Sequence, residues 1–120
     1  WEKYAKKSPR RFPGVGPGSE SETQCFLKHF EDYSPDFVIS IHTPLNVLDF
    51  DGPRLKTKPT FEYLPWKSLG TFPGSLGKYL WVERATPVLT TELKSTLPKS
   101  STAFEQLQDL IGTLVKTDLK

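Results

Sequence analysis

Two ionisable side chains occupy positions where a sheet can place chemistry. His42 closes the apolar run 37–41, and Glu92 interrupts the apolar run 87–93. Open α/β sheets bind ligands beyond the carboxyl ends of their strands, so His42 suits a ligand or catalytic role, with a hydrogen-bonded structural histidine as the alternative. An unpaired carboxylate inside a strand is costly to bury. Glu92 is therefore either a general base beside the sheet or a strand-end residue that reaches solvent or an arginine.

The elements that must position these two residues follow from hydrophobic periodicity and capping signals. Phenylalanines at helical spacing predict a first helix, opened by a Ser19–Glu22 capping box. The stretch 54–73 has no clean period and is most simply a long loop, which in a compact domain is usually functional. In chain order the expected elements are helix 19–33, strand 37–42, strand 47–50, helix 75–83 capped by Ser75, strand 87–93 and a helix opened by a Thr102–Glu105 capping box.

This order predicts an α/β fold, namely part of a three-layer α/β/α sandwich with a mixed, mostly parallel sheet. The strands are too few for a complete doubly wound sheet, and the sequence contains no methionine, not even an initiator. We therefore expect residues 1–120 to form the C-terminal portion of one domain whose N-terminal half is missing from the chain.

Composition narrows the classes of function. Sixteen Lys and Arg residues against fourteen Asp and Glu give a net charge of +2, which does not indicate a partner nucleic acid or membrane surface. No apolar run approaches the roughly 20 residues of a membrane span. Cys25 is the single cysteine, which excludes an intramolecular disulfide framework. A single cysteine leans toward the cytoplasm as the compartment, with the periplasm left open.

A glycine-rich loop, 14–18, precedes the first helix and superficially resembles a phosphate-binding loop. It follows no strand, lacks the Lys-Ser/Thr ending and contains Pro17 where N–H donors are wanted. A nucleotide-binding α/β domain is therefore a weak third interpretation.

Three stretches, 18–23, 37–43 and 87–93, together resemble the zinc metallocarboxypeptidases of the funnelin group. In that family a helix opening with Ser-Glu-x-Glu-Thr leads to a strand ending Ser-Ile-His, and a later strand reads Thr-x-Glu-Leu. The same motifs stand here in the same order, and the resemblance runs from about Trp1 to Leu97. The stretches 8–14 and 74–80 look most like the bacterial murein-peptide amidase branch, whose members cut the bond between γ-D-glutamate and diaminopimelate.

The resemblance implies roles for particular residues. His42 becomes the third ligand of one Zn²⁺ ion, and Glu92 becomes the general base and acid. Substrate contacts are implied at Leu76, Lys78 and Thr90, although a solvated helix lysine is the plainer reading of Lys78. The family's His-x-x-Glu zinc motif and its Asn-Arg clamp belong upstream of the position where this chain begins. Its loop tyrosine aligns near Leu69, where this sequence has none.

Two functions from different classes remain as hypotheses. The first is a zinc-dependent carboxypeptidase or amidase that acts on a peptide or cell-wall peptide, with an N-terminal complementary segment as its partner. One zinc ligand does not hold a catalytic ion, so the chain alone is expected to be inactive. The second is a non-catalytic binding module, or an inactive fragment, with a degenerate peptidase fold.

Overall fold

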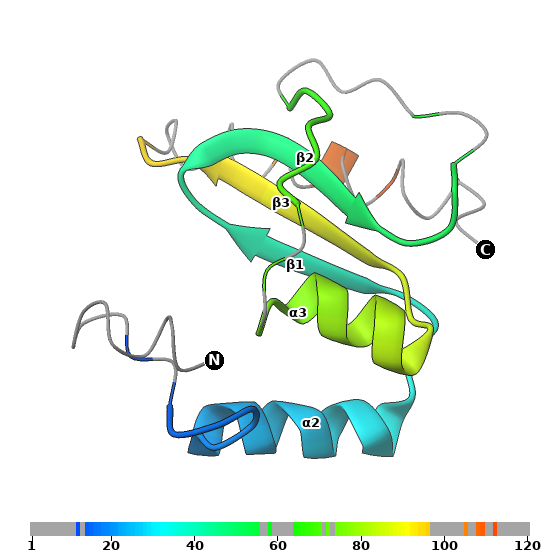
Figure 1. The fold of residues 1–120 in the computed structure, drawn as a ribbon. Coiled ribbons are helices and arrows are strands. Elements are labelled where there is room, and N and C mark those ends of the chain that lie inside the picture. The colour runs from blue at the N-terminus through cyan, green and yellow to red at the C-terminus, as the bar shows by residue number, and fades with distance from the viewer. Residues whose placement is uncertain are drawn as a thin grey trace.

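The computed structural model describes residues 12, 14–55, 58, 64–70, 72, 74–96, 105, 108, 109 and 112. Helix α2 (Ser21–Tyr33) comes first, followed by strands β1 (Val38–His42) and β2 (Leu45–Asp51). A second helix starts as α3 (Leu76–Lys78) and continues as the wider π-helical segment η2 (Tyr79–Glu83). Strand β3 (Val88–Lys94) follows it. All five regions expected from the sequence between 19 and 93 are present in the expected class (Figure 1).

The three strands form one mixed sheet in the order β1-β3-β2. β3 lies between the other two, parallel to β1 and antiparallel to β2. The α/β class and the mixed sheet are therefore as the sequence predicts. Helices α2 and α3 lie on the same side of the sheet, with α3 between the sheet and α2 (Figure 1). The three-layer sandwich stays a prediction.

The register gives the sheet one apolar face and one mixed face, on which charged side chains lie beside Val38, Val47 and Val88. Leu48 on β2 and Leu89 on β3 are fully buried, and with Leu64 they form the core cluster of the apolar face. Phe37, Ile39, Phe50, Leu55, Trp66 and Leu93 pack against this cluster. Because side chains alternate along a strand, the residues between these project to the opposite face, where α3 lies. That opposite face contains every charged residue of the expected strands.

Part of the expected loop 54–73 pairs with the sheet. Trp66 forms a parallel bridge with Leu48, in which Leu48 N donates to Pro65 O and Lys67 N donates to Leu48 O, each at 2.9 Å. The segment therefore satisfies backbone groups on the outer edge of β2, which a sequence pattern without a period does not show.

The helix caps agree only in part with the sequence. The hydroxyl of Ser75 accepts a hydrogen bond from Lys78 N at 3.4 Å, as expected. The Ser19–Glu22 capping box is wrong: Glu20 is the N-cap residue and makes no side-chain cap bond. Ser19 donates instead to Glu20 Oε1 at 2.9 Å, so its hydroxyl is engaged before the helix begins.

Helix α2 forms as predicted, but the described residues do not bury its apolar face. No residue of α2 is buried, and Phe26 is 37% exposed. Arg84 at the end of η2 reaches α2 through an ion pair with Glu31 at 2.8 Å. The second helix is buried more deeply than α2. Its Leu80, on η2, is fully buried, as the periodicity predicts.

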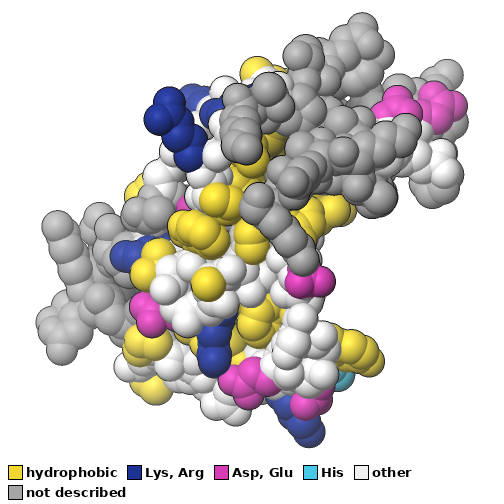
Figure 2. Space-filling view, turned by 90° about the vertical axis from the view of Figure 1, so that its right-hand side faces the viewer, with side chains coloured by type: hydrophobic (Ala, Val, Ile, Leu, Met, Phe, Trp, Pro, Cys, Tyr) yellow, Lys and Arg dark blue, Asp and Glu magenta, His cyan; other side chains and the backbone are white. Residues whose placement is uncertain are grey.

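The final helix lies largely outside the described residues. Glu105, Gln108, Asp109 and Gly112 are helical, in agreement with the expected element. Figure 2 shows acidic and basic side chains interspersed on one face of the described part, which fits the near balance of charge. Among the described helices, none is long and apolar enough to cross a membrane.

Candidate active site

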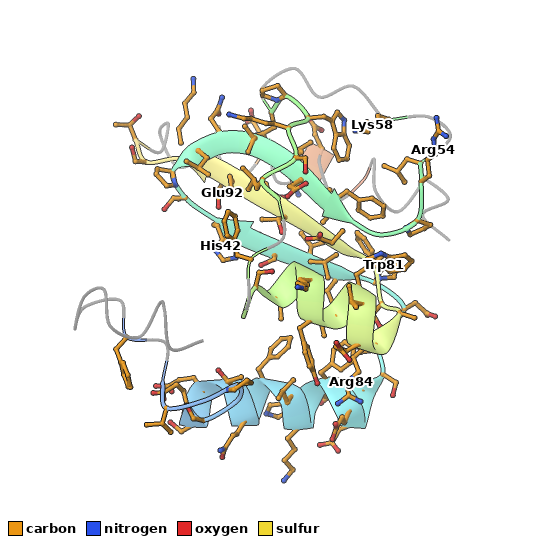
Figure 3. All side chains as sticks on the ribbon, viewed as in Figure 1. His42, Arg54, Lys58, Trp81, Arg84 and Glu92 are labelled. Atoms are coloured by element: carbon orange, nitrogen blue, oxygen red, sulfur yellow. The ribbon has the colours of Figure 1, made fainter. Side chains whose placement is uncertain are left out.

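His42 and Glu92 lie side by side at the ends of two neighbouring strands. They are register partners on the parallel strands β1 and β3, so their side chains project from the same face of the sheet. Neighbouring strands are about 4.8 Å apart, so His42 and Glu92 are direct cross-strand neighbours. Figure 3 shows both side chains at the same end of the sheet. The sequence placed His42 at a strand end and Glu92 inside a strand, and the fold brings them together.

The imidazole of His42 is exposed but is held by a neighbour. Its Nε2 lies 2.7 Å from the hydroxyl oxygen of Ser40, two residues earlier on the same face of β1. Within the described part of the chain, the other ring nitrogen, Nδ1, has no hydrogen-bond partner. One ring nitrogen is thus anchored to the strand, and the other is available to a ligand.

The carboxylate of Glu92 is buried, with 9% of the residue exposed. Its Oε2 accepts a hydrogen bond from Leu45 N at 3.4 Å, and Leu45 begins β2 just after the turn that follows His42. The alternative in which Glu92 reaches solvent or an arginine is not what the described residues show. One backbone N–H therefore orients Oε2.

Two further carboxylates lie on the same face, on β2. Asp49 is 8% exposed, and its Oδ1 accepts from Phe50 N while its Oδ2 accepts from Leu69 N, each at 2.9 Å. Asp49 is the register partner of Thr90, which in turn pairs with Ser40. A polar row of Ser40, Thr90 and Asp49 therefore lies directly behind the row that holds His42 and Glu92.

Asp51 extends this face toward α3. Partial burial, and after it the charge of Asp49, raise the pKa of the Asp51 carboxyl above its ordinary value. A Cβ atom added to the buried Gly77 would overlap the carboxylate of Asp51, so the backbone of α3 packs directly on this side chain. Asp51 thus joins this face of the sheet to the helix above it.

The three residues expected to contact substrate lie at different distances from His42 and Glu92. Thr90 lies on the site face, two positions before Glu92 on β3. Leu76 and Lys78 flank Gly77, whose neighbour Asp51 pairs with Val88, about 13 Å along β3 from Glu92. Lys78 is exposed, and in the described part of the chain no hydrogen bond or ion pair joins it to His42 or Glu92. Substrate roles for Leu76 and Lys78 stay predictions.

Sequence reasoning gave no site role to Ser40 and did not single out Asp49. The signal for Asp49 is the alternation of Leu48, Asp49, Phe50 and Asp51, which places two carboxylates on one strand face. The signal for Ser40 is its spacing of two from His42. Neither signal indicates a site role until β3, which carries Glu92, is known to be the neighbouring strand.

The side chains at this site can be compared with the ligands that a zinc ion needs. Catalytic zinc takes three protein ligands and keeps a position open for water. The described residues contain no group of three or more His, Cys, Asp or Glu side chains that could hold a metal. His42 fits one ligand position, because its ring is exposed and no described residue bonds Nδ1, and Glu92 fits a carboxylate beside that position. The described residues thus fit part of a zinc site.

Comparison with known proteins supports the fold. No protein-family model matches the chain, and no curated protein sequence matches it. Among solved structures, the chain is similar to murein-tripeptide amidase MpaA from Escherichia coli O157, with a TM-score of 0.64 and 24% sequence identity. The match covers 84% of this chain and 44% of the amidase chain. The chain therefore has a peptidase- or amidase-like α/β fold and spans less than half of that neighbour.

Proposed function

We propose that this chain carries the C-terminal part of the active site of a zinc-dependent metallopeptidase or amidase. The observation that carries the proposal is the pairing of His42 with Glu92 across β1 and β3, in a fold similar to that of an amidase. An exposed imidazole next to a buried carboxylate supplies two of the groups that metal-assisted amide hydrolysis uses, one metal ligand and one general base.

His42 is proposed as one zinc ligand, with the remaining ligands supplied by a segment outside these 120 residues. A zinc ion held there would supply Lewis-acid polarisation of an amide carbonyl and a bound water whose pKa is lowered toward about 7. Glu92 then acts as the base and acid: Oε1 accepts a proton and returns it to the leaving amine. The bond from Leu45 N holds Oε2 and so keeps Oε1 directed to this task.

The proposed substrate is a peptide amide, with the γ-D-glutamate–diaminopimelate bond of murein peptides as the specific candidate. Support comes from the structural neighbour, which is a murein-tripeptide amidase, and from the motif resemblance in 8–14 and 74–80. Thr90, on the same face as Glu92, is the best placed of the proposed substrate contacts.

We also propose where the complementary segment docks. β1 is an outer strand of the described sheet, with Ile41 50% exposed, so one side of its backbone is open to pairing. A segment that adds a strand to β1 would lie next to His42, where further zinc ligands are needed.

The test is zinc content and hydrolysis of a γ-D-glutamyl-diaminopimelate tripeptide, measured on this chain in complex with its upstream polypeptide. We expect about one zinc per complex, lost in His42→Ala and kept in His29→Ala, a matched exposed histidine on α2. Glu92→Gln should keep zinc and lose roughly 10²–10⁴-fold in kcat.

The same experiment distinguishes the proposed peptidase or amidase function from the alternative, a non-catalytic binding module. A complex that binds no zinc and cleaves no peptide would overturn the proposal and favour the non-catalytic binding module. Zinc that persists in His42→Ala would remove His42 from the site, whatever the activity.

A further inference from the structure

The hydrogen bond between Ser40 and His42 has a direction that matters for chemistry. The two residues share a face of β1, and the Ser40 oxygen lies 2.7 Å from Nε2. A neutral imidazole carries one N–H, while a serine hydroxyl both donates and accepts. Two arrangements are therefore compatible with this distance, and they differ in which ring nitrogen keeps a lone pair.

The first arrangement has the hydroxyl donating to Nε2. The ring proton then resides on Nδ1, and Nδ1 has no lone pair to offer. The second has Nε2–H donating to the serine oxygen. Nδ1 then keeps its lone pair and, within the described part of the chain, has no competing partner. Only the second arrangement leaves His42 able to bind a metal or accept a proton through Nδ1.

We propose that Ser40 is a positioning residue that accepts the Nε2–H of His42 and so holds the lone pair of Nδ1 free on the site face. Metal-binding histidines almost always donate their second N–H to an oxygen, which fixes the tautomer and the ring orientation. The role of this hydrogen bond in preparing His42 to bind a metal rests on the proposed function. Its existence does not, because the tautomer is a property of the metal-free chain.

Ser40 is suited to this role by its burial. The serine is half-buried, whereas His42 is exposed, and an exposed imidazole samples several rotamers unless something restrains it. A bond to a hydroxyl on the same strand restrains the ring without help from any residue on another element. The orientation is therefore set before any partner or metal arrives.

Nitrogen-15 NMR of the two imidazoles in the metal-free chain, at alkaline pH where the rings are neutral, tests the proposal. In the wild type we expect Nε2 of His42 to have the shift of a protonated nitrogen and Nδ1 that of an unprotonated one. In Ser40→Ala both shifts should move toward each other, because the tautomers and rotamers average. Ser40→Thr keeps the hydroxyl and should restore the wild-type shifts.

Two controls keep the result specific. His29, which stacks on Tyr33 at the far side of α2, should give the same shifts in every variant. Ser68→Ala removes an exposed serine hydroxyl elsewhere and should leave His42 unchanged. A wild type with the proton on Nδ1, or a Ser40→Ala spectrum identical to wild type, overturns the proposal.

Zinc affinity of the complex with the upstream polypeptide separates this proposal from the proposed function. If both hold, Ser40→Ala weakens zinc binding by roughly tenfold to a hundredfold, and Ser40→Thr restores it. If the complex binds no zinc while the NMR result holds, the zinc function is wrong and the positioning role of Ser40 stands.

Discussion

At the residue scale, Thr91 has a buried hydroxyl that the described residues do not satisfy. Thr91 is fully buried between the register partners Ile41 and Leu48, and its Oγ1 has no hydrogen-bond partner within the described part of the chain. Thr91→Val replaces the hydroxyl with a methyl group of similar shape. We expect the free energy of unfolding to rise by about 1 kcal/mol, because an unsatisfied polar group leaves the core.

Chemical denaturation of the full chain measures this change. Thr91→Ser is the matched control: it keeps the hydroxyl, loses the methyl group and should lower stability. A Thr91→Val chain less stable than wild type would mean that the hydroxyl has a partner after all.

The carboxyl of Asp51 makes stability depend on pH. Because burial and Asp49 raise its pKa, the folded chain binds more protons than the unfolded chain as pH rises above the ordinary carboxyl value. This contribution to the free energy of unfolding is fully present in acid and is lost as pH rises through the raised pKa. Asp51→Asn should therefore stabilise the chain at neutral pH, by less than about 1 kcal/mol since the group is partly exposed and screened.

Thermal unfolding across the acid range checks the sign. Asp49→Asn is the contrasting variant, because an amide has one acceptor oxygen and Asp49 uses both of its oxygens, on Phe50 N and Leu69 N. We expect it to lose about 1–3 kcal/mol. Equal effects of the two variants would contradict the different environments assigned to the two carboxylates.

At the element scale, the contact of α3 with the sheet depends on Gly77. A Cβ at this position would overlap the carboxylate of Asp51, so Gly77→Ala must displace this carboxylate or push α3 away from β2. We expect a loss of about 1–3 kcal/mol of unfolding free energy. In an Asp51→Ala background the loss should be smaller, because the overlapping atoms are gone.

A double-mutant cycle on Gly77 and Asp51 measures this coupling. Gly16→Ala is the control, because Gly16 has open space around it and no positive φ, and it should be near neutral. No coupling between the two positions would show that α3 and β2 do not meet through this contact.

At the scale of the whole molecule, we expect the edge of β1, an outer strand of the described sheet, to control association. Exposed apolar edge strands pair with other chains, and charged side chains on the edge suppress such pairing. Ile41→Lys should therefore reduce self-association of the isolated chain, measured by sedimentation at several concentrations. The same variant should weaken binding of the upstream polypeptide, because the lysine lies at the proposed docking edge.

Val82→Lys is the matched control for the edge. Val82 is 60% exposed on η2, away from the sheet edge, so its charge should change neither measurement. If Ile41→Lys and Val82→Lys act alike, the edge of β1 has no special role and the docking proposal fails.

The sequence by itself determined where the helices and strands lie and which of their side chains are apolar. Periodicity located α2, the three strands and the inward Leu80, because burial of apolar side chains has a period that a single segment reveals. The same pattern placed His42 at a strand end and Glu92 inside a strand, positions suited to chemistry. The capping box at Ser19 failed because a neighbouring glutamate competes for the same hydroxyl, a contact that spacing does not report.

Only the tertiary structure decided which strands are neighbours. β1 and β2 follow each other in the sequence, yet β3 inserts between them and brings Glu92 beside His42. A hydrophobic pattern specifies which face of a strand is buried, whereas partner choice depends on how all the strands pack at once. The same packing gave Asp49 a partner in the distant Leu69 N. Pairing across the sheet, not spacing along the chain, created the candidate site.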